Sequence, residues 1–171
     1  RDALSLLDRL LATGETRLTV ELLDRMLGLP AQTVLSELIH AFARGDAATA
    51  LGRVEALIQQ GVGQDQLMVA LVDRLRQLML IATCGAESEL VEWTGEARET
   101  AAEEAKLFDA PTLVHMIGIC ESVHRAARDS ANARALLDAA LVRLARAESM
   151  TDITGLLAGT GTGPGTGSGD R

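Results

Sequence analysis

The sequence is poor in aromatic residues and contains a single lysine, Lys106. Phe, Trp and Tyr together make up 2% of its 171 residues, whereas hydrophobic residues make up 47%. A core built from Leu, Ala, Val, Ile and Met favours helices over strands. Lys and Arg number 16 against 24 Asp and Glu, which gives a net charge of −8. So acidic a chain is a poor general ligand for nucleic-acid phosphates, and we expect no direct contact with DNA or RNA.

Catalytic and metal-binding patterns are also lacking. The sequence has no GxxxxGK[ST] phosphate loop, no GxSxG turn and no HExxH motif. His115 and His124 do not have the i, i+4 spacing of a zinc pair on one helix. Seven glutamates between residues 87 and 104 have the spacing of a solvated helical surface. We therefore expect no enzymatic activity, metal or cofactor in this stretch of chain.

The two cysteines, Cys84 and Cys120, are far apart and belong to no CxxC pair. This spacing predicts two reduced, partly buried thiols in a cytoplasmic protein. Neither a signal peptide nor an apolar run of membrane-spanning length is present, so we expect no membrane association. The chain begins at Arg1 rather than at a methionine, and we expect it to be a piece of a longer protein.

The most apolar long run, residues 64–83, is the stretch around which the other segments are expected to pack. It contains neither proline nor glycine, and its leucines and methionines recur at steps of three and four residues, the period of a helix. Such a helix would be a rod of roughly 30 Å. Its polar side is narrow, little more than Asp73, Arg74, Arg76 and Gln77. Other helices are therefore expected to cover most of its circumference.

Seven further stretches are expected to be helices, most of them bounded by glycine or proline. They are residues 1–11, 20–27, 31–44, 47–60, about 95–107, about 109–128 and 133–147. Gly45 and Asp46 are expected to end one helix and begin the next, and Asn132 is expected to cap the last one. Joints this short predict antiparallel or steeply crossed neighbours. Residues 86–94 are predicted to contain a short helical turn, with Trp93 as a packing anchor.

The opening octet RDALSLLD resembles the start of the sensor 2 helix in the gamma/tau subunit of bacterial DNA polymerase III, the AAA+ motor of the clamp loader. The segments that follow keep the order of that family. They are MLG at residues 26–28, a GD break at 45–46, QGV at 60–62, LRQLMLI at 75–81 and NAR…LL…A…LVRLA at 132–145. Many family members have proline and glutamate where this chain has Ala133 and Asp138. The resemblance covers about residues 1–147.

The resemblance implies an all-α fold in three parts. Residues 1–28 would be the end of the AAA+ lid domain, and residues 29–150 the helical collar that holds clamp-loader subunits in a ring of five. Residues 151–171, which end in GTGTGPGTGSGDR, would be a flexible, disordered linker or tail. Arg1 falls at the nucleotide-sensing arginine of the parent protein. That parent would use ATP and Mg to load the sliding clamp on primed DNA in the bacterial cytoplasm, and this part would supply assembly.

The resemblance also implies partners. These are other clamp-loader subunits (further gamma/tau copies, delta and delta-prime), together with polymerase and helicase through a tau-type extension. Apolar stripes that one copy cannot cover alone are the candidate interface, although some of these side chains must face the chain's own core. The candidates are Leu67, Leu71, Leu75, Leu137, Leu141 and Leu144. Two alternatives stay open, the lid and oligomerisation region of another AAA+ ATPase and a free-standing helical adaptor.

Overall fold

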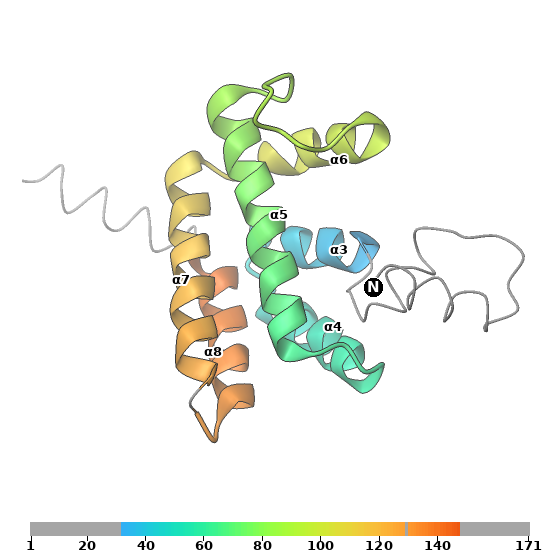
Figure 1. Ribbon diagram of the computed structural model, residues 1–171. Helices are drawn as coiled ribbons and strands as arrows, with labels where there is room; N and C mark the ends of the chain where they lie inside the picture. The colour runs from blue at the N-terminus through green and yellow to red at the C-terminus, as the bar shows by residue number, and fades with distance from the viewer. Residues whose placement is uncertain (1–31, 129, 148–171) are drawn as a thin grey trace, which may run out of the picture.

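The computed structural model describes residues 32–128 and 130–147. Arg1, the expected helices over residues 1–11 and 20–27, and the tail lie outside this part of the chain. The described residues form six helices and no strand, which confirms the predicted all-α class (Figure 1). The helices are α3 (Gln32–Ala43), α4 (Ala47–Gln59), α5 (Gln64–Cys84), α6 (Gly95–Ala105), α7 (Ala110–Arg128) and α8 (Ala133–Ala145).

Helix α5 runs through the middle of the bundle, as its apolar composition predicted (Figure 1). Helix α7 runs beside it in the opposite direction, and α6 packs against α5 close to its C-terminal end. Helices α3 and α4 pack against each other, and α8 closes the bundle by packing against both α7 and α4. None of the helices in the described ranges is long and apolar enough to cross a membrane.

The short joints from α3 to α4 and from α4 to α5 depend on glycines with positive φ. Gly45 has a φ of 68°, its N–H donates to the carbonyl of Phe42 at 3.0 Å, and the N–H of Asp46 donates to the carbonyl of Ala41 at 2.9 Å. These two bonds satisfy carbonyls that the helix end leaves free, in the pattern of a Schellman motif. Gly61, with a φ of 93°, ends α4 in the same way. The chain can therefore change direction within three or four residues.

Aspartates cap the first turns of α4 and α7. Asp46 Oδ1 accepts the N–H of Thr49 at 2.9 Å, and Asp109 Oδ1 accepts the N–H of Thr112 at 2.7 Å. In each case the threonine hydroxyl and N–H lower the pKa of the carboxyl group below its ordinary value. Asn132 occupies the N-cap position of α8, but its side chain makes no cap hydrogen bond, so the predicted cap is wrong in that respect.

Leucines from every helix except α6 meet in one continuous core. Its largest fully buried side chains are Phe42, Leu35, Leu38, Ile39, Leu67, Leu71, Leu75, Leu78, Leu113, Met116, Leu141 and Leu144. Trp93 is partly buried and packs against this core, which confirms its predicted role as an anchor. The helical turn predicted within residues 86–94 is not formed. Two hydrogen-bonded turns, Ser88 N–H to Gly85 O and Val91 N–H to Ser88 O, take its place.

Candidate functional site

The six leucines predicted as interface candidates lie in the core of a single copy. All six side chains, Leu67, Leu71, Leu75, Leu137, Leu141 and Leu144, have exposed fractions of 2% or less. A leucine already covered by its own chain presents no area to a partner. Contacts with other subunits through α5 or α8 would therefore use the exposed side chains of these helices. Arg1, the predicted nucleotide-sensing residue, lies outside the described residues.

Arg74 of α5 is buried in an ion pair and does not face solvent, contrary to its predicted place on the polar side of the central helix. Its Nε and Nη2 atoms donate to Glu104 Oε2 of α6 at 2.9 and 2.6 Å, and Nη2 also donates to Ser36 Oγ of α3 at 3.0 Å. Arginine suits this position because its guanidinium keeps its charge and offers several donors. The pair therefore ties three helices together.

Glu104 corrects the prediction that all seven glutamates between residues 87 and 104 face solvent. Its side chain is 1% exposed, whereas the other six are exposed. A carboxylate can be buried here because Arg74 compensates for the water it loses. The other oxygen of Glu104, Oε1, is buried without a hydrogen-bond partner, so the pair is held by one carboxylate oxygen alone.

The segment between α5 and α6 is fastened to α5 by polar side chains. The guanidinium carbon of Arg74 lies 4.4 Å from the centre of the Trp93 ring, a cation–π arrangement. Gln77 is buried as well, and its Oε1 atom accepts the N–H of Glu92 at 3.3 Å. Arg98 of α6 donates from Nε to the carbonyl of Trp93 at 2.7 Å. Two polar residues of α5, Arg74 and Gln77, therefore position this loop.

The groups that could perform chemistry are scattered. Among residues 32–128 and 130–147, no set of three His, Cys, Asp or Glu side chains could hold a metal ion. Both cysteines were predicted to be partly buried, but Cys84 is exposed and Cys120 is fully buried. Burial, with a smaller effect from the negative charge of Glu121, raises the pKa of Cys120 to about 12. Cys120 is therefore a packing residue with the thiol kept protonated.

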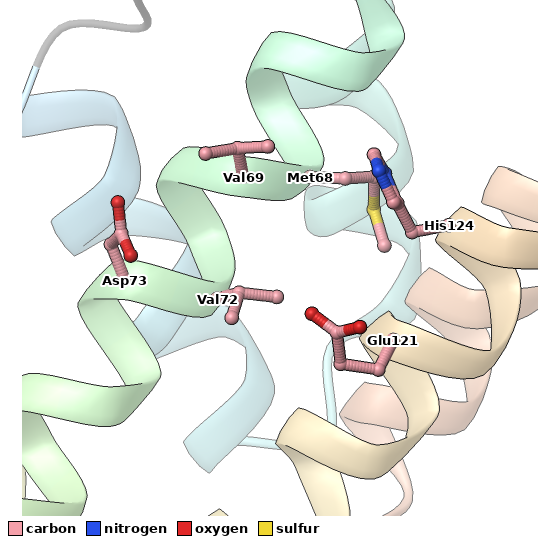
Figure 2. A pocket seen from close by; sticks show the side chains of 6 residues that line it. All are labelled: Met68, Val69, Val72, Asp73, Glu121 and His124. Carbon is pink, nitrogen blue, oxygen red and sulfur yellow. The ribbon is translucent and has the colours of Figure 1, made fainter.

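A shallow hollow of about 180 Å³ lies between α5 and α7 (Figure 2). Its walls are Met68, Val69, Val72 and Asp73 of α5 and Glu121 and His124 of α7. Glu121 and His124 extend from α7 toward α5, where Val72 and Met68 face them (Figure 2). Pockets for drug-sized ligands have volumes of about 300–1,000 Å³. The hollow is below that size and is suited to a single side chain.

Both helices carry an exposed valine; Val69 lines the hollow, and Val114 lies about two turns before Glu121 on α7. Val69 of α5 is 53% exposed and Val114 of α7 is 57% exposed. Gly118 follows Val114 by one turn of α7 and is also exposed; a Cβ placed there would meet no atom within 4 Å. We call the surface formed by Val69, Val72 and Asp73 of α5 and Val114, Gly118 and Glu121 of α7 the α5–α7 face.

The charges on the α5–α7 face are acidic and weakly paired. Asp73 is exposed and makes no ion pair with any residue in the described ranges. Glu121 lies 3.9 Å from Arg125, at the outer limit for an ion pair. The Nδ1 atom of His124 is buried without a hydrogen-bond partner. The hollow thus combines apolar walls with two accessible carboxylates.

Sequence reasoning missed Val69 and Gly118, although both gave a signal. Val69 lies four residues before Asp73, on the polar side of the central helix, where an apolar residue has no core to contact. Gly118 interrupts a long helical pattern at a cost of about 1 kcal/mol relative to alanine. Nothing in the described part of the chain requires glycine at that position. An apolar residue and a glycine at exposed helical positions are the features that mark this face.

Comparisons with known proteins agree on one family. Residues 18–158 match the family described as DNA polymerase III subunits gamma and tau domain III. The DNA polymerase III subunits gamma/tau of Mycobacterium bovis (strain ATCC BAA-935 / AF2122/97) and Mycobacterium tuberculosis (strain ATCC 25618 / H37Rv) are each 26% identical to this chain over 147 residues. The aligned region is 84% of this chain and 25% of each relative, so the chain spans about a quarter of their length. No solved structure gives a significant match.

Proposed function

Because the chain belongs to the family of DNA polymerase III subunits gamma and tau, whose domain III it matches over residues 18–158, we propose that it is the collar of a clamp-loader subunit. The match begins after the opening octet, so the family assignment does not depend on RDALSLLD. This removes the two alternatives, a different AAA+ family and a free-standing adaptor.

The observation that supports a collar role is the closed helical core. Residues 32–128 and 130–147 bury apolar side chains from six helices in one cluster, and the Arg74–Glu104 pair fixes α3, α5 and α6 relative to one another. A ring of motor subunits needs a part that holds its shape while the motors move. The proposed role is to supply that part to a pentameric loader with other gamma/tau copies, delta and delta-prime.

The chemistry of the loader is assigned to the rest of the parent protein. We propose that the parent hydrolyses ATP with Mg in the bacterial cytoplasm and that Arg1 senses the γ-phosphate there. The proposed division places the lid in residues 1–28 and the collar in residues 29–150. A tau-type extension after residues 151–171 would connect the collar to polymerase and helicase. On this division, the chain alone hydrolyses no ATP, and measurable turnover by the purified chain would contradict it.

Co-purification with the other subunits tests the assembly role. The chain is expressed with delta and delta-prime from the same genome, and the mass of the eluted species is measured by sedimentation. We expect a complex that contains all three proteins. Elution of the chain alone, at every concentration and with a native helical spectrum, would overturn the assembly role while leaving the fold intact.

A further inference from the structure

We propose that the α5–α7 face receives an arginine side chain from an apolar helix of a neighbouring subunit. This inference rests on the proposed assembly function and adds the chemistry of one contact. The hollow is apolar at its walls and acidic at its rim, and its volume of about 180 Å³ suits one side chain. The occupant should therefore be long, partly apolar and positively charged.

The shape of arginine matches the hollow in both respects. Its three methylene groups can lie along the apolar surface of Met68 and Val72 while the charged end stays near water. The guanidinium would then lie beside Glu121 of α7, and the exposed Asp73 of α5 would add negative charge nearby. Its fork of donors suits a carboxylate, whereas the compact ammonium of lysine acts as a point charge.

The acidic rim supplies the charge complementarity. Neither lysine nor arginine lines the hollow, Asp73 has no ion pair within the described ranges, and the contact of Glu121 with Arg125 is a loose one at 3.9 Å. A cation from a partner would therefore meet two carboxylates without breaking a strong bond. The guanidinium would also bring a polar group near the Nδ1 atom of His124, which is buried without a hydrogen-bond partner.

The exposed apolar positions on α5 and α7 suit a helix as the carrier of this arginine. Val69 and Val114 offer exposed apolar area on the two helices. The missing side chain at Gly118 allows another backbone to approach α7 closely. Pairing of this face with the same face of a second copy is disfavoured, because Asp73 and Glu121 would meet like charges. The contact is therefore heterologous, as the head-to-tail geometry of a ring requires.

Removal of the two rim charges tests the proposal in the co-purified complex. Asp73→Asn with Glu121→Gln keeps the shape of both side chains and removes their charge. The matched control is Glu89→Gln with Glu99→Gln, because both glutamates are exposed and neither forms an ion pair in the described part of the chain. We expect the rim variant to weaken association with delta or delta-prime roughly tenfold and to reduce its salt dependence. The control should bind like the unmodified chain.

A second variant tests the same surface without changing charge. Gly118→Gln adds a helix-favouring side chain where the bundle has open space, so the melting temperature should hold or rise. We expect this variant to lose association because the added side chain occupies the path of the partner helix. If both the rim variant and Gly118→Gln assemble normally, the proposed contact is wrong. Stronger association of the rim variant would also overturn it, and failure of the unmodified chain to assemble would overturn the underlying function.

Discussion

Arg74 and Glu104, on α5 and α6, form the most buried ion pair of the described residues, with Nη2 and Oε2 2.6 Å apart. Their side chains are 4% and 1% exposed, whereas every other ion pair in these ranges involves side chains that are at least 26% exposed. Ion pairs on the exposed surface of a protein contribute little to stability. Loss of one partner of a buried pair, in contrast, leaves the other partner as an uncompensated buried charge. The two kinds of pair should therefore respond very differently to mutation.

Arg74→Ala is expected to lower the free energy of unfolding by about 3–5 kcal/mol, because Glu104 would remain buried without its partner. Arg76→Ala, which removes the exposed partner of Glu92, should cost less than about 1 kcal/mol. Urea titration followed by circular dichroism measures both. The double change Arg74→Met with Glu104→Leu should recover most of the loss, and equal losses in the double and single variants would contradict this explanation.

Leu71→Arg and Val69→Arg separate core from surface on α5. Leu71 is fully buried, so an unpaired charge there should unfold the bundle, whereas Val69 is 53% exposed and should accept arginine without loss of helicity. Thermal unfolding measured by circular dichroism distinguishes the two variants. A folded Leu71→Arg variant would show that the core is less tightly packed at this position than its burial indicates.

Asp109 provides an acid-dependent contribution to stability. Its folded pKa lies below the ordinary value of 3.8 because of the hydrogen bonds from Thr112, so its contribution is complete above about that pH and is lost as the pH falls through the folded pKa. Asp109→Ala should cost about 1 kcal/mol at neutral pH, whereas Asp109→Asn should cost much less because asparagine also caps. Melting temperatures measured from pH 7 to pH 2 should converge for wild type and Asp109→Ala. A constant difference would exclude titration of this cap.

The two cysteines should differ in reactivity. At pH 8 a thiol reagent such as DTNB should modify Cys84 rapidly, because it is exposed, while Cys120 is buried with a pKa of about 12. Absorbance should report one thiol per native chain and two after unfolding in urea. Cys84→Ser should leave no fast-reacting thiol in the native chain. Equal rates for both cysteines would indicate that α7 opens readily.

Helix boundaries could be predicted from the sequence because glycines stand at several of the positions where helices end. The predicted helix over residues 47–60 is observed as Ala47–Gln59, and the one over residues 64–83 as Gln64–Cys84. The positive φ at Gly61 is a local requirement of the backbone, so it leaves a trace in the sequence itself. A helix boundary can therefore be predicted without knowing which helices pack against each other.

The burial of Arg74 and Glu104 could not be predicted in the same way. Sequence patterns assign charged residues to the surface, and a pair thirty positions apart has no local signature. The burial of all six candidate leucines within a single copy could not be predicted for the same reason. The helix period shows that Leu67 and Leu71 share a side but not which helix covers that side. That depends on how the other helices pack, with α7 against α5 and α8 against α7 and α4.

The contact of α8 with α3 and α4 has a consequence for synthesis on the ribosome. A Cβ placed at Gly45, in the joint between α3 and α4, would lie 3.5 Å from the carbonyl oxygen of Ala145 at the end of α8. Among the described helices, the earliest are therefore covered in part by the last. Chains emerge N-terminus first, so α3 and α4 keep apolar surface uncovered until α8 has left the exit tunnel. Nascent chains that stop before α8 should be the ones that chaperones bind.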